Sequence, residues 1–194
     1  MGKLPKHRMA RRRAKSHSSF GPQRGFRLTN ANPPDEFLTS SQTDASVLAA
    51  LELMKSGAAE EDAARHLSWR DFEQFCAYLF KAGGYTVENN VLLSHPRAQI
   101  DLVAVGPIFV ISLDCKHWKR APSRSRLEEI AEAQLRRSKL LRARLRDSGP
   151  IVSAIVTYSE PQERFVNGVA VVPVRTLGNF IQTVESYPDL LEVS

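Results

Sequence analysis

The sequence predicts an α/β domain in which helices flank a central mixed β-sheet, with a helical extension and a basic arm ahead of it. Short apolar runs typical of buried strands are interspersed with stretches of helical periodicity. Three strand patterns follow one another before the next long helix, which favours a mixed order over strict βα alternation. Charge is also uneven along the chain, which separates the first residues from the rest.

The basic character of the chain lies in its first 30 residues. They hold nine of the 27 Lys and Arg and none of the 21 Asp and Glu, so they carry +9. The remainder has 18 basic against 21 acidic residues, or −3, within a net charge of +6. Few apolar residues and a run of like charge predict that residues 1–43 form a disordered arm and linker. We expect Arg11, Arg12 and Arg13 to attract phosphate groups without reading a base sequence.

Residues 44–67 have the pattern of a helical extension that packs on the domain. Val47, Leu48, Leu51 and Met54 recur at three- and four-residue spacing, and Gly57 supplies a helix end. A second short helix is expected in the segment "AAEEDAARHL". We assign the remaining residues, 68–194, to one domain.

The domain begins with a helix signal and continues with strands. Ser68 and Asp71 resemble a capping box, and Gly83-Gly84 ends the helix. The turn Gly106-Pro107 separates two apolar runs and predicts an antiparallel hairpin. The further elements are strands over 85–93, 99–105 and 108–115, a helix over 123–147 stopped by Gly149-Pro150, strands over 151–158 and 169–174, and a closing helix over 176–187.

Charged residues at the ends of the hairpin strands are the candidate chemistry. Asp114 and Lys116 lie two apart in a strand and project from one face, while Cys115 points to the other. Pairing through the Gly106-Pro107 turn would bring Asp101 close to Asp114. Two adjacent carboxylates repel each other unless a cation or a proton separates them, and Mg²⁺ takes such oxygen ligands together with water and phosphate oxygens. Lys116 could then orient or deprotonate a nucleophile, or stabilise charge on a phosphorane.

These residues resemble the PD-(D/E)xK nuclease signature, the mark of the restriction-endonuclease-like superfamily. The acid is Asp101 and the (D/E)-x-K segment is Asp114-Cys115-Lys116, although Ile100 replaces the proline. The helix "WRDFEQFCAYLFKAGGYTV" is similar to the start of Mrr-type domains and archaeal Holliday-junction resolvases. The resemblance implies the restriction-endonuclease-like fold over about residues 68–184, with Asp101, Asp114 and the Cys115 carbonyl as metal ligands and Lys116 as the catalytic lysine.

The resemblance also implies two auxiliary residues. Glu73 matches a helix glutamate of the family; it falls among Trp69, Cys76 and Phe80 on an apolar arc, and the alternative is that it reaches water. Gln134 lies seven residues from both Leu127 and Leu141, on the buried stripe of the long helix. It resembles a family glutamine near the active site, and the alternative is an amide that bonds a backbone carbonyl.

The predicted function is a Mg²⁺-dependent DNA endonuclease, with Mn²⁺ able to substitute, that acts on DNA of branched or other structure. Eleven Lys and Arg against three Glu between residues 116 and 146 favour phosphate contacts, with Lys119, Arg120, Arg124 and Arg126 nearest the catalytic strand. Two alternatives stay open: an inactive nucleic-acid-binding protein on the same fold, and an RNA-binding protein that acts through its arm. Cutting both strands usually needs two sites, so a homodimer is one expectation.

Other classes of protein fit the sequence poorly. Two cysteines are too few for a disulfide framework or a zinc site, and no apolar stretch has the roughly 20 residues that cross a bilayer. The N-terminus has no apolar segment of a secretory signal, so we expect no membrane association and a cytoplasmic, nucleoid-associated protein.

Overall fold

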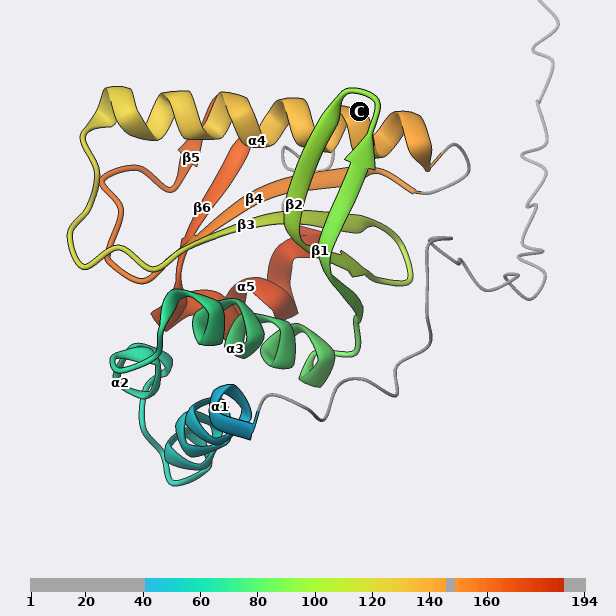
Figure 1. Cartoon of the computed structure of the whole chain (residues 1–194). Helices are drawn as coiled ribbons and strands as arrows, with labels where there is room; N and C mark the ends of the chain where they lie inside the picture. The colour runs from blue at the N-terminus through green and yellow to red at the C-terminus, as the bar shows by residue number, and fades with distance from the viewer. Residues whose placement is uncertain (1–40, 146–148, 187–194) are drawn as a thin grey trace, which may run out of the picture. The chain divides into compact units, whose positions relative to one another are not determined.

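The computed structural model describes residues 41–145 and 149–186; residues 1–40 of the predicted arm and linker (1–43) lie outside them. Its elements follow the predicted mixed order (Figure 1). They are α1 (Ser41–Lys55), α2 (Glu60–Ala64), α3 (Trp69–Ala82), β1 (Thr86–Ser94), β2 (Arg97–Val105), β3 (Val110–Lys116), α4 (Arg124–Arg144), β4 (Ile151–Thr157), β5 (Phe165–Val166), β6 (Val169–Pro173), the 3-10 turn η2 (Val174–Thr176), α5 (Leu177–Thr183) and the 3-10 turn η3 (Val184–Ser186).

The described strands form one mixed sheet in the order β1-β2-β3-β4-β6-β5. β1, β2 and β3 pair antiparallel, β3 pairs parallel with β4, and β4 pairs parallel with β6. β3 and β4 lie at the centre of the sheet and are apolar over most of their length, as strands covered on both faces are. A mixed sheet flanked by helices is the architecture of the restriction-endonuclease-like fold, so the predicted fold class is confirmed.

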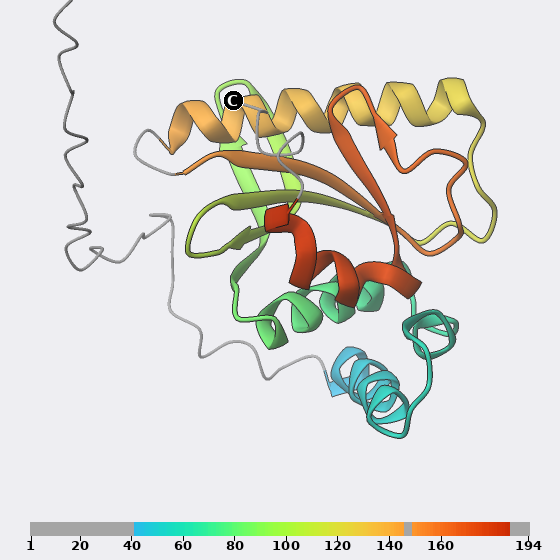
Figure 2. The ribbon, with the colours of Figure 1, turned by 180° about the vertical axis from the view of Figure 1, so that it is seen from behind.

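Helices cover the sheet on both faces. α4 crosses one face, and α3 and α5 pack on the other, with α1 and α2 beyond α3 (Figures 1 and 2). The α3 side holds the larger apolar core, which includes Phe72, Phe75 and Phe80 of α3 and reaches Val47 of α1. The α4 side holds a smaller cluster around Leu127 and Ile155. Successive residues of β3 therefore face different layers, Cys115 toward α3 and Asp114 toward α4.

The helix ends follow the local signals that the sequence contains. The Ser68 side chain accepts a hydrogen bond from the Asp71 amide and donates one to the Asp71 carboxylate, which caps α3. Gly83 is the C-cap of this helix, and Gly57 after α1 has a φ of +99°, a conformation that favours glycine. Among the described residues, no helix is long and apolar enough to span a bilayer.

The structure differs from the prediction in five places. α1 begins at Ser41, three residues before the predicted start, and β3 begins at Val110. α4 ends at Arg144, and Leu145 is its C-cap. The two-residue strand β5 was not predicted, because two residues are too short to show periodicity. Trp69 is 62% exposed, so it does not belong to the buried arc of α3 on which the sequence placed it.

Candidate active site

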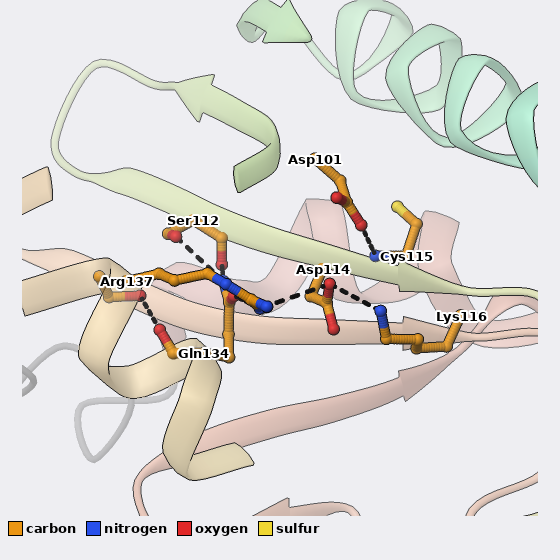
Figure 3. Close-up of polar contacts among 8 residues, drawn as sticks. Asp101, Ser112, Asp114, Cys115, Lys116, Gln134 and Arg137 are labelled. Carbon is orange, nitrogen blue, oxygen red and sulfur yellow. Dashed lines mark hydrogen bonds and ion pairs between the residues drawn. The ribbon is translucent and has the colours of Figure 1, made fainter. Parts of the chain in front are cut away.

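The site lies where β2 and β3 separate. Their ladder ends at the pair Leu102–Leu113, one residue short of both Asp101 and Asp114. Beyond this pair β2 continues with β1 and β3 continues with β4. The separation leaves the amide of Cys115 without a strand partner on that side, and the Asp101 carboxylate accepts its hydrogen bond at 2.8 Å (Figure 3). The predicted convergence of the two aspartates at one end of the hairpin therefore agrees with the geometry.

Asp114 is almost completely buried and is only partly paired. Lys116 Nζ donates to Asp114 Oδ1 at 2.9 Å, as expected for side chains two residues apart on one strand face (Figure 3). Asp114 Oδ2 is buried and has no hydrogen-bond partner among the described residues. A buried carboxylate oxygen without a donor is costly, so this atom is a candidate cation ligand.

The three carboxylates of the site repel one another. Burial, and after it the charge of Asp114, raises the pKa of Asp101 to about 6, although the bond from the Cys115 amide opposes the rise. Burial, and after it the charge of Asp101, raises the pKa of Glu73 to about 7, with Lys116 opposing. Glu73 is 7% exposed, which disagrees with the alternative that it reaches water. It thus adds a third carboxylate to the site from α3.

The Cys115 side chain takes no part on this face. Its thiol lies in the core on the α3 side, where contact with the Cys76 thiol and burial raise its pKa well above the usual range. Its backbone belongs to the site through the N–H bonded to Asp101. That the Cys115 carbonyl binds metal stays a prediction.

Gln134 of α4 is fully buried beside the aspartates. Its Nε2 donates to the Ser112 carbonyl at 2.8 Å and to the Ser112 hydroxyl at 3.0 Å (Figure 3). The backbone bond that the sequence left as an alternative is therefore present. Its Oε1 accepts from Arg137 Nη1 at 3.3 Å, and the same Nη1 lies 3.6 Å from Asp114 Oδ1. Sequence reasoning missed Arg137; its spacing of three residues from Gln134, on one helix face, was the available signal.

The basic residues predicted to bind nucleic acid lie at the surface. Lys119 and Arg120 are exposed in the segment between β3 and α4. Arg124 pairs with Glu128 and Glu163, and Arg126 pairs with Glu129, all as exposed ion pairs of small energetic weight. Arg11, Arg12 and Arg13 lie outside the described residues.

A divalent cation fits the donor set formed by the two aspartates. The described residues contain no group of three or more His, Cys, Asp or Glu that could hold a metal ion. Mg²⁺ needs only one or two carboxylates, since waters and phosphate oxygens complete its shell. The unpartnered Asp114 Oδ2 and the raised pKa of Asp101 both indicate a site with too little positive charge. Asp101 and Asp114 are the residues that would hold the ion.

A family model described as "Restriction endonuclease" (Mrr_cat) matches residues 64–142. That segment contains Glu73, Asp101, Asp114, Lys116 and Gln134. Over this segment the chain is similar to restriction-endonuclease domains. No curated protein matches the sequence.

Solved structures similar to this chain are distant in sequence. Protein VC1899 from Vibrio cholerae is 10% identical, with a TM-score of 0.46. The match covers 78% of this chain and 51% of VC1899, so this chain spans about half the length of that protein. The protein of unknown function AF1548 is 13% identical, with a TM-score of 0.44, and the match covers 61% of this chain and 66% of AF1548. The small subunit of the heterodimeric restriction endonuclease R.BspD6I is 12% identical, with a TM-score of 0.44, and the match covers 74% of this chain and 78% of that subunit.

The metal-free protein should become less stable as pH rises through the range in which Glu73 ionises. Its pKa of about 7 in the fold lies above the usual 4.5, so the folded state binds the proton more tightly. Stability is then fully present below about pH 4.5 and falls until the pH exceeds about 7. In EDTA, Glu73→Gln should therefore gain about 1–2 kcal/mol over wild type at pH 8 and little at pH 5.

Urea unfolding at the two pH values measures this difference. Glu52→Gln is the matched control, because Glu52 is an exposed glutamate of α1. An equal gain for Glu73→Gln at pH 5 and pH 8 would contradict the raised pKa.

Proposed function

We propose that the protein is a divalent-metal-dependent endonuclease that hydrolyses phosphodiester bonds in DNA. The observation that carries the proposal is the meeting of Asp101, Asp114 and Lys116 where β2 and β3 separate, inside the segment that the restriction-endonuclease family model matches. DNA as the substrate is inferred from this family match. Mg²⁺ is the proposed ion, with Mn²⁺ as a substitute.

Each residue of the site has a proposed role. Asp101 and Asp114 would hold the ion, which when bound would polarise the phosphate and lower the pKa of water. Lys116 carries a positive charge beside them and its side chain is 27% exposed, so substrate can reach it. Its ammonium would stabilise negative charge that develops on the phosphorane oxygens. Glu73 would orient water at the α3 side of the site.

Gln134 is proposed to act through its neighbours. Its side-chain amide donates to Ser112 and accepts from Arg137. It would therefore position β3 and Arg137 and would not contact the phosphate itself. Lys119, Arg120, Arg124 and Arg126 are proposed to contact the DNA backbone, with the arm residues Arg11, Arg12 and Arg13 adding attraction that depends on salt.

The activity is tested with supercoiled plasmid, branched DNA and single-stranded DNA, each with Mg²⁺, with Mn²⁺ and with EDTA. We expect cleavage of at least one substrate with either metal and none with EDTA. Cleavage that persists in EDTA would reject the metal dependence, and absence of cleavage on all three substrates would favour a binding protein on the same fold.

Metal binding is tested without activity, by thermal unfolding. An ion that binds only the folded state stabilises it by about 2.7 kcal/mol at one hundred times its Kd, which raises Tm by roughly 5–10 °C in a chain of this size. Lys116→Ala should keep this shift, because the lysine is not a ligand. Asp101→Asn and Asp114→Asn should lose most of it. A shift of equal size in all four proteins would place the ion elsewhere.

A further inference from the structure

Arg137 lies in the candidate site and has no role in the function proposed so far. Its side chain is 30% exposed, and its Nη1 lies 3.6 Å from Asp114 Oδ1. The neighbouring Arg136 differs: its side chain is 70% exposed and it lies 3.9 Å from Glu132, one turn away on the same helix. Of these adjacent arginines, only Arg137 reaches a carboxylate of the site (Figure 3).

Gln134 fixes the position of the Arg137 guanidinium. The Gln134 amide is fully buried and both of its contacts through Nε2 go to Ser112 on β3, so it has little freedom to move. The Oε1 that accepts from Arg137 is therefore a fixed acceptor, and it joins the arginine to the centre of the sheet.

The contact of Arg137 with Asp114 does not use the donors of the arginine. A charge-assisted hydrogen bond measures about 2.7–2.9 Å and is often bidentate for arginine, whereas this contact is longer. Lys116 already bonds Asp114 Oδ1 at 2.9 Å, and Asp114 Oδ2 stays unpartnered among the described residues. An arginine placed to neutralise Asp114 would bond that second oxygen. The guanidinium has five N–H donors, and in the described part of the chain its one hydrogen bond goes to Gln134.

We propose that Arg137 is a phosphate-contacting residue of this site, held by Gln134 so that its unused donors meet a non-bridging oxygen of the DNA phosphodiester beside Asp114. The inference rests on the proposed function, since it takes the phosphodiester as the ligand. A planar guanidinium presents paired donors to phosphate oxygens, which suits a fixed arginine better than a mobile lysine. Lys116 and Arg137 then flank the phosphate from two elements, β3 and α4.

The test is DNA binding by fluorescence anisotropy, in EDTA and in millimolar Ca²⁺, a hard cation that takes the same oxygen ligands. Gels run in parallel establish that the DNA stays intact. Arg137→Ala should weaken binding about tenfold in Ca²⁺ and reduce the slope of log K against log salt by about 1. Arg136→Ala removes the same charge one residue away and should change affinity less than about twofold. Arg137→Lys should recover part of the affinity.

Cleavage kinetics and stability complete the test. With Mg²⁺, Arg137→Ala should lower kcat/KM about 10²-fold, mostly through kcat, and Arg136→Ala should leave it unchanged. Melting temperatures check the fold, and Arg137→Lys keeps the aliphatic stem if the alanine variant unfolds. Equal affinities and salt slopes for Arg137→Ala and Arg136→Ala would overturn the inference. Absence of cleavage by wild type would instead count against the proposed function, and the binding result would still decide the role of Arg137.

Discussion

Lys116→Ala and Asp114→Asn are each expected to lower the rate of DNA cleavage by at least about 10³-fold while DNA binding changes little. Lys116 is the cation closest to the buried carboxylate, at 2.9 Å from Asp114 Oδ1, so its loss removes charge stabilisation that matters most in the transition state. Asp114→Asn removes the negative charge that would hold the ion but keeps the shape of the side chain. Single-turnover cleavage of the best substrate, beside anisotropy in EDTA, measures both effects.

Two controls separate the site from general charge effects. Lys139→Ala removes an exposed lysine of α4, and Asp62→Asn alters an exposed aspartate that pairs with Arg65 on α2. Both should cleave within about threefold of wild type, because surface pairs contribute little. Undiminished cleavage in Lys116→Ala and Asp114→Asn would remove the proposed mechanism. Wild-type protein that binds DNA but never cleaves it would leave the binding-protein alternative.

Phe72→Ala is expected to destabilise the metal-free protein by about 3–5 kcal/mol, a large share of the stability of a small domain. Phe72 is completely buried and directly precedes Glu73. Its ring lies 5.0 Å from that of His117, which lies 4.8 Å from that of Tyr158. These three rings join α3 to His117, which follows β3, and to Tyr158, which follows β4. The cavity left by alanine would therefore lie in the core between α3 and the sheet.

Urea unfolding in EDTA measures the loss of stability, with Tyr78→Ala as the matched control. Tyr78 lies on the same helix and is 40% exposed, so its truncation should cost less than about 1 kcal/mol. A cost below about 1 kcal/mol for Phe72→Ala would mean that the α3 layer is not packed as described.

The elements that the sequence predicted well are those with strong local signals. The capping pair Ser68 and Asp71 determined the start of α3, and the apolar runs determined β2, β3 and β4 within about two residues. Register also followed from sequence, because a single turn at Gly106-Pro107 places Asp101 near Asp114. The roles of the site residues, and the division of the chain at residues 43 and 67, stay predictions.

The features that the sequence did not predict depend on tertiary packing. Where the β2–β3 ladder ends cannot be read from either strand, since both remain apolar around the aspartates. Helical spacing puts Arg137 on the face of Gln134, but the sequence could not show that its guanidinium reaches Asp114 on β3, because that depends on how α4 packs on the sheet. Helical spacing placed Trp69 on an apolar arc of α3, but its side chain is exposed whereas Phe72 of the same helix is completely buried.

The bonds that hold the two aspartates also limit how each can bind an ion. Oδ2 of Asp101 accepts from the Cys115 amide and Oδ1 of Asp114 accepts from Lys116, so on each carboxylate one oxygen is free of these bonds and better placed to bind an ion. Monodentate coordination suits a small octahedral ion that keeps most of its waters, whereas a larger ion often draws on both oxygens of a carboxylate. The preference for a small divalent cation over a larger one would then be set by the Cys115 amide and Lys116, which bond the two aspartates, before any DNA binds.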